Sequence, residues 1–149
     1  PGDNFDMNNS HVIPALIRKF NEAKIKNDKE AVVWGTGKPK REFLYADDLA
    51  DACVFMMNTY DDPKIINIGA GEDISIHDLA GKIKAVVGFK GVITWDLSKP
   101  DGTPRKLLDV SKLHALGWKH AMVIDAGLEQ TYQWYIKNYK DDRKIYSKN

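Results

Sequence analysis

Helical and extended apolar patterns alternate along this 149-residue chain, and the alternation limits the folds that it can adopt. Apolar residues recur at a spacing of about 3.6 from residue 12 to residue 26, which predicts an amphipathic helix. The apolar face of this helix comprises Ile13, Leu16, Ile17 and Phe20. Short β-branched runs predict strands at 31–34 and at 92–95, and residues 42–45 are expected to form a further extended stretch. Short loops between such elements favour a small mixed α/β domain, with an α+β-like arrangement.

Capping and turn residues indicate where four further helices begin or end. Asp47 and Asp48 supply acceptors and negative charge at the start of one helix. Ser75, three residues before Asp78, resembles a capping box that opens the next helix. A short helix is expected over 111–116, and a last helix over 125–139. One domain over 1–140 is therefore expected, followed by a charged tail at 141–149 that we expect to be disordered.

The charge balance argues against binding to nucleic acid or to a membrane through bulk electrostatics. The chain has 22 Lys and Arg against 21 Asp and Glu, a net charge of +1. No apolar run approaches the roughly 20 residues of a membrane span, and the start lacks a signal-peptide pattern. A cytoplasmic setting is therefore expected. The opening Pro1-Gly2-Asp3-Asn4 reads like the middle of a loop, so we expect the chain to be a piece of a longer protein.

The single cysteine, Cys53, cannot form an internal disulfide. It shares a predicted helix face with Leu49 and Met56, so we expect a buried structural thiol and not a nucleophile. The histidines after residue 11 are scattered without ligand spacing, and no metal site is expected.

Three stretches carry residues that could do chemistry. His11 stands at the start of the first predicted helix, where unpaired backbone donors attract anions and a histidine can donate a proton. From sequence alone, a solvated residue near a helix end is the commoner interpretation of one histidine. Two helical turns on, Arg18 shares the face of His11, and Lys19 flanks the apolar stripe. Either could reach a phosphate, although most such basic residues are simply solvated.

The second stretch runs from Trp34 to Phe43. The indole of Trp34 offers a flat face for stacking, and Arg41 offers a planar fork suited to two phosphate oxygens. The glycines between them allow close approach to a ligand, but an ordinary turn beside a core tryptophan would have the same composition. The third stretch, 99–106, is a proline-stiffened loop that carries Asp101 and Lys106. Such a loop could clamp a diphosphate, or it could be a solvated surface loop.

Read in order, these segments resemble the C-terminal half of GDP-L-fucose synthases, a branch of the extended short-chain dehydrogenase/reductases. The strings specific to that branch are Ser10-His11-Val12-Ile13-Pro14 and Lys99-Pro100-Asp101-Gly102-Thr103-Pro104-Arg105-Lys106. Strings shared more widely by sugar-nucleotide epimerases are Gly35-Thr36-Gly37, Arg41-Glu42-Phe43 and Asn67-Ile68-Gly69. The resemblance extends to about Tyr139 and implies the C-terminal substrate domain of such a reductase, with 1–140 binding a GDP-sugar.

The resemblance also implies an activity: 3,5-epimerisation of GDP-4-keto-6-deoxy-D-mannose and NADPH-dependent 4-reduction to GDP-L-fucose. By similarity, His11 would be the proton donor of the epimerisation and lie near the nicotinamide. Trp34 and Arg41 would hold the GDP moiety, and Asp101 and Lys106 would close over it. Lys19 stands where relatives often have arginine and cannot make the same bidentate contact.

The family's glycine-rich dinucleotide loop does not occur in this sequence. NADPH would therefore be bound mainly by an N-terminal dinucleotide-binding domain, which would be this chain's partner in a homodimeric protein. The 149 residues alone are expected to be inactive. The alternatives are the C-terminal domain of another extended reductase, such as a nucleotide-sugar 4-epimerase or a GDP-mannose dehydratase, and a non-catalytic GDP-sugar binding module.

Overall fold

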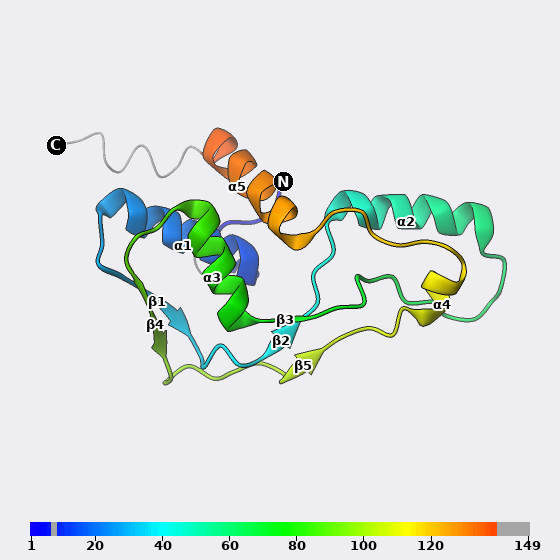
Figure 1. Ribbon diagram of the computed structural model, residues 1–149, viewed down its shortest axis with the longest axis horizontal. Helices are drawn as coiled ribbons and strands as arrows, with labels where there is room; N and C mark the ends of the chain where they lie inside the picture. The colour runs from blue at the N-terminus through cyan, green and yellow to red at the C-terminus, as the bar shows by residue number, and fades with distance from the viewer. Residues whose placement is uncertain (7–8, 140–149) are drawn as a thin grey trace.

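Helices at two ends of the protein are joined by short strands in the computed structural model, which describes residues 1–6 and 9–139 (Figure 1). The helices are α1 (Val12–Lys26), α2 (Ala46–Thr59), α3 (Ile76–Val87), α4 (Ser111–Ala115) and α5 (Ile124–Asn138). The strands are β1 (Glu30–Trp34), β2 (Lys40–Arg41), β3 (Ile74–Ser75), β4 (Val92–Asp96) and β5 (Arg105–Lys106). This architecture confirms the small mixed α/β fold expected from the sequence.

The strands form two small sheets that carry the connecting loops. β1 and β4 pair in parallel, with Glu30 opposite Val92 and Trp34 opposite Asp96. β2 lies between β3 and β5, antiparallel to β3 and parallel to β5. In the second pairing, Arg41 lies opposite Lys106. The ends of β1 and β4 therefore lead directly into the loops that precede β2 and β5.

The larger core fills the space between α1, α3, α5 and the β1–β4 sheet. Phe20 of α1 is fully buried and stacks on Phe89 with ring centroids 5.8 Å apart. Phe5 packs against Tyr135 of α5 at 4.7 Å and so fastens the N-terminal segment to the last helix. These contacts anchor α1, whose N-terminal end lies beside the site described below.

A second, smaller core lies at the other end, where α2 meets α4. Only Ala52 and Met56 of α2 are buried, and Trp118 donates from Nε1 to Asp51 at 2.8 Å. Cys53 is exposed, so the expectation of a buried thiol is wrong. The helical spacing placed Cys53 near Met56, but the narrow contact of α2 with α4 covers only part of the apolar face.

Most predicted boundaries agree with the structure within one or two residues. The Ser75 cap is confirmed, because its hydroxyl accepts from the backbone of Asp78 at 3.0 Å. The stretch expected to be extended at 42–45 does not form a strand, since β2 is two residues long and ends at Arg41. Asp48 lies in the first turn of α2, yet its carboxylate accepts from the backbone of Ala121 and Met122 instead of capping the helix. The tail at 141–149 lies outside the described residues.

Within residues 1–6 and 9–139, no helix has the length and apolar character to cross a membrane. The same residues contain no group of three or more His, Cys, Asp or Glu side chains placed to hold a metal ion.

Candidate nucleotide-sugar site

A cavity of about 210 Å³ lies where the β1–β2 loop, the β4–β5 loop and the start of α1 meet. It brings together three residues that the sequence singled out: Trp34, Arg41 and Asp101. The other residues of its wall are Val12, Gly37, Pro39, Ile76, Pro100 and Gly102. Residues 67 positions apart in the chain thus share one hollow of the surface, because β1 pairs with β4 and β2 pairs with β5.

Trp34 presents its indole to solvent at the end of β1, with 62% of the residue exposed. Two ammonium groups lie over its ring, Nζ of Lys19 at 5.6 Å and Nζ of Lys99 at 5.4 Å from the centroid. Nζ of Lys19 also donates to the carbonyl of Val32 at 2.6 Å, and its burial lowers the pKa of Lys19. Lys19 therefore holds the indole from the α1 side.

Arg41 is fixed by the loop that leads into β5. Its Nη1 donates to the carbonyl of Thr103 at 2.6 Å and to that of Lys40 at 2.7 Å. Gly102 leaves room for the guanidinium, because a Cβ there would lie 2.8 Å from Nη2. Lys106 does not line the cavity, but it is exposed and lies opposite Arg41 in the β2–β5 register. Residues opposite each other in a sheet project from the same face, so the two cations are neighbours.

Asp101 joins the two loops of the cavity. Its carboxylate accepts from the backbone N–H of Thr36 at 2.8 Å and from the Thr36 hydroxyl at 2.6 Å. The hydroxyl bond, and next the backbone bond, lower the pKa of Asp101. Gly35 allows this approach, because it has a φ of +81° and a Cβ there would lie 2.4 Å from the carboxylate. Asp101 thus forms a wall of the cavity.

His11 and Arg18 differ in their relation to the cavity. His11 is the exposed N-cap residue of α1 and directly precedes Val12, which lines the wall. Arg18 faces away: its guanidinium donates to Glu22 at 2.7 Å, to the carbonyl of Phe5 at 3.0 Å and to the Tyr139 hydroxyl at 2.9 Å. Of the two basic residues considered on α1, Lys19 is the one beside the site.

Comparison with known proteins shows what the chain is similar to. The NAD dependent epimerase/dehydratase family matches residues 1–69. The chain is 56% identical over 138 residues to GDP-L-fucose synthase 1 of Arabidopsis thaliana, covering 93% of this chain and 43% of that protein. It is 52% identical over 147 residues to GDP-L-fucose synthase of Escherichia coli K12, covering 93% and 46%. The crystal structure of a GDP-L-fucose synthetase from Naegleria fowleri bound to NADP matches with a TM-score of 0.87 and 33% identity, covering 95% and 44%.

The chain is homologous to the C-terminal part of GDP-L-fucose synthases. It spans less than half the length of these relatives. The homology accounts for the order in which the loop motifs follow one another along the chain.

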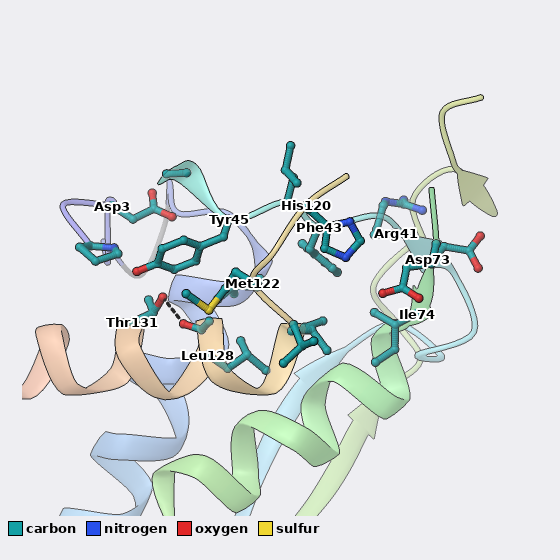
Figure 2. Close-up of a pocket in the computed structure, with 18 of the residues that line it drawn as sticks. Asp3, Arg41, Phe43, Tyr45, Asp73, Ile74, His120, Met122, Leu128 and Thr131 are labelled. Atoms are coloured by element: carbon teal, nitrogen blue, oxygen red, sulfur yellow. Dashed lines mark hydrogen bonds between the residues drawn. The ribbon is translucent and has the colours of Figure 1, made fainter. Parts of the chain in front are cut away.

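A second and larger cavity, of about 510 Å³, lies on the other side of Arg41 (Figure 2). Arg41 lines both cavities, so its guanidinium stands at their boundary. In Figure 2, Tyr45 and Met122 lie over α5, and His120 and Asp73 lie toward the end occupied by Arg41. Nδ1 of His120 is buried and has no hydrogen-bond partner. The walls are mainly apolar, with Asp73 near Arg41 and Asp3 toward the opposite end.

Several residues of the two cavities escaped the sequence analysis. Beside the smaller cavity, Thr36 contacts Asp101 and Lys99 contacts Trp34. Both residues fall within strings that carry the resemblance, but the sequence analysis gave neither of them a role. The wall of the larger cavity draws on segments from Pro1 to Thr131. Only long-range packing brings these segments together, so no local motif could have revealed them.

Proposed function

We propose that this chain is the substrate-binding part of a GDP-L-fucose synthase. The whole protein would convert GDP-4-keto-6-deoxy-D-mannose into GDP-L-fucose by 3,5-epimerisation and NADPH-dependent 4-reduction. One observation carries the proposal: Trp34, Arg41 and Asp101 converge on a single cavity, with Lys106 beside Arg41. This set combines a stacking surface for a base, two cations for a diphosphate, and a carboxylate acceptor.

The proposed roles follow from the side-chain chemistry. Guanine would stack on the exposed indole of Trp34, which Lys19 holds in place. Arg41 and Lys106 would bind the diphosphate, since a guanidinium fork matches two phosphate oxygens and a lysine adds a point charge. Asp101 would accept from a hydroxyl or amino group of the nucleoside. Because Arg41 also borders the larger cavity, a sugar attached to the diphosphate would extend toward that side.

His11 is proposed as the acid that returns a proton during epimerisation. Proton abstraction beside a ketone produces an enolate-like intermediate, and a positioned acid must deliver a proton to the opposite face. His11 is exposed at the N-terminus of α1, next to the cavity wall, where unpaired backbone N–H groups also favour a bound anion. We also propose that His11 contacts the nicotinamide of the cofactor.

The residues of this chain do not by themselves suit a dinucleotide. No Gly-x-x-Gly-x-x-Gly string joins a strand to a helix in the printed sequence, and the positive-φ glycines at 35 and 37 serve the Asp101 loop and the Trp95 contact instead. NADPH would supply the hydride for C4, and no step of that transfer is assigned to these residues. We propose that a dinucleotide-binding domain provides the cofactor site, in a cytoplasmic homodimer.

Titration calorimetry of the 149-residue chain with GDP tests the nucleotide site. Saturable binding is expected, and Arg41→Met should weaken it by roughly ten- to a hundredfold, because a hydrogen bond to a charged group contributes about 1.5–3 kcal/mol. Lys90→Met removes one charge from an exposed position outside the cavity and is the matched control. Absence of binding by the unaltered chain, or equal binding by the Arg41→Met variant, would contradict the proposal.

Two activity measurements test the catalytic part. The 149-residue chain mixed with NADPH and the keto sugar nucleotide should show no turnover. In a protein that joins this chain to a dinucleotide-binding domain, His11→Gln should abolish epimerisation and leave the affinity for GDP nearly unchanged. A nucleotide-sugar 4-epimerase or a GDP-mannose dehydratase has no need of a histidine acid at this position, so an unchanged reaction in the His11→Gln protein would favour those alternatives.

A further inference from the structure

Glu42 directly follows Arg41, and its carboxylate ties the end of β2 to two distant segments. Oε1 accepts from the backbone N–H of Gly71 at 2.6 Å, and Oε2 accepts from that of Leu108 at 2.9 Å. Leu108 lies two residues after Lys106, the last residue of β5. One side chain therefore connects the two strands that carry Arg41 and Lys106, and adds the turn at 69–71 as a third support.

Two glycines shape the turn that receives this carboxylate. A Cβ at Gly69 would lie 2.4 Å from Oε1 of Glu42, so a larger residue there would collide with it. Gly71 has a φ of +79°, and a Cβ there would lie 2.7 Å from Val110. The tight turn directs the N–H of Gly71 toward Glu42. The shape of the turn therefore favours a specific interaction with the carboxylate over a chance surface contact.

The β2–β5 pairing is only two residues long and needs such support. Its register partners are Lys40 with Arg105 and Arg41 with Lys106. After Arg41 the backbone pairing stops, and the N–H of Leu108 donates to the carboxylate of Glu42 instead of to a backbone carbonyl of β2. On the other side of the same segment, the Asn67 amide donates to the carbonyl of Asp109 at 3.0 Å. The backbone after β5 is thus held by side chains on the strand and on the turn.

Charge supplies the second reason for a fastening at this point. Neighbouring strands lie about 4.8 Å apart, so Arg41 and Lys106 place two positive charges side by side on one face. Like charges directly opposite each other in a sheet are destabilising. A bound diphosphate would neutralise the two positive charges. Without a bound anion, the repulsion between Arg41 and Lys106 favours separation of the two strands. The Glu42 carboxylate opposes that separation through its hydrogen bonds and its negative charge.

We propose that Glu42 is a positioning residue that keeps Arg41 and Lys106 at the spacing required by a nucleoside diphosphate. The inference rests on the proposed GDP site and extends it to a residue outside the cavity wall. Glu42 acts through the strand register and does not contact the ligand. Its removal should therefore affect recognition of the phosphates more than recognition of the base, which depends on Trp34.

The Glu42→Gln variant of the 149-residue chain tests this separation by calorimetry with GDP and with guanosine. Glutamine keeps the shape but replaces one acceptor oxygen with an NH₂ group, which cannot accept from the N–H of Gly71 or Leu108. The affinity for GDP should fall about tenfold, the effect of one lost bond to a charged group, while the affinity for guanosine should change less than about twofold. A purely structural defect would weaken both ligands together.

A double-mutant cycle identifies the cation through which Glu42 acts. Lys106→Met should weaken GDP binding in the unaltered chain and have a smaller effect in the Glu42→Gln chain, because Lys106 is already misplaced there. If Glu42→Gln does not fold by circular dichroism, Glu42→Asp, which keeps the charge but reaches only one of the two N–H groups, carries the same comparison.

The outcomes separate this inference from the proposed function. If the unaltered chain does not bind GDP, the proposed function itself fails. If it binds GDP more tightly than guanosine and Glu42→Gln retains that preference, only the role of Glu42 is refuted. Additive effects in the cycle, or equal losses for GDP and guanosine, would also overturn it.

Discussion

Replacing Trp34 with alanine is expected to weaken GDP binding by about 2- to 30-fold. Stacking of a base on an aromatic side chain contributes about 1–3 kcal/mol. In the free protein, however, the indole already interacts with Lys19 and Lys99, at 5.6 and 5.4 Å from its centroid. An incoming base must displace one ammonium, at a cost of about 0.5–1 kcal/mol for an exposed cation–π pair. The net contribution is then about 0.5–2 kcal/mol, which gives the expected loss.

Lys99 is the group that we expect to move, because Lys19 is also held by its bond to the Val32 carbonyl. Calorimetry with GDP measures the affinity, and Trp34→Phe should recover part of the loss by restoring an aromatic face. Leu97→Ala is the matched control, since Leu97 is a similarly exposed apolar residue of the same region and does not line the cavity. Unfolding in urea should change little for Trp34→Ala, because 62% of the residue is exposed. Equal affinities of the Trp34→Ala and Leu97→Ala variants would refute the stacking argument.

Three further predictions concern stability and titration. Ser75→Ala should lower the free energy of unfolding by about 1 kcal/mol near neutral pH, as loss of an N-cap does. In the folded protein, the hydrogen bond between Asp78 and Ser75, and next the bond between Asp78 and His77, lower the pKa of Asp78. This contribution is present above the unfolded pKa of about 4 and is lost as the pH falls through the lower folded pKa, so urea unfolding should show a smaller difference in acid. Thr36→Val should raise the pKa of Asp101 toward its ordinary value, whereas Thr36→Ser should keep it lowered. An NMR titration of the Asp101 carboxyl measures both, and an equal change of its pKa in the two variants would contradict this. Phe20→Ala should cost about 3–5 kcal/mol of unfolding free energy in urea, whereas Ile65→Ala, at a position 91% exposed, should change it by less than about 0.5 kcal/mol.

The sequence predicted the elements whose formation depends on local periodicity. α1, α3 and α5 appear where apolar spacing placed them, and β1 and β4 where β-branched residues cluster. These elements surround one continuous core, so their buried faces follow directly from the pattern. Ser75 could be identified as a cap because a cap requires only neighbours in the chain.

The errors occurred where distant segments decide the local structure. Cys53 lies on a helix of which only Ala52 and Met56 are buried, so periodicity alone overestimated its burial. The stretch at 42–45 lies outside the strand: β2 ends at Arg41, and it is the carboxylate of Glu42, and not its backbone, that accepts from the N–H of Leu108 after β5. Asp48 looked like a cap but binds the backbone of Ala121 and Met122, more than 70 residues away.

The candidate site follows the same division. The sequence identified Trp34, Arg41 and Asp101 by their chemistry and by resemblance, but the contacts that hold them come from elsewhere in the fold. Each loop is fastened by an acidic side chain that accepts backbone N–H bonds: Asp101 on Thr36, and Glu42 on Gly71 and Leu108. A carboxylate suits this task, because it can accept two such bonds and its charge offsets nearby cations. Strands of two residues have too few ladder bonds to fix the spacing of cations by themselves, so side chains must set it. If the proposed site binds a diphosphate, substitutions outside the cavity wall should therefore change how tightly it binds.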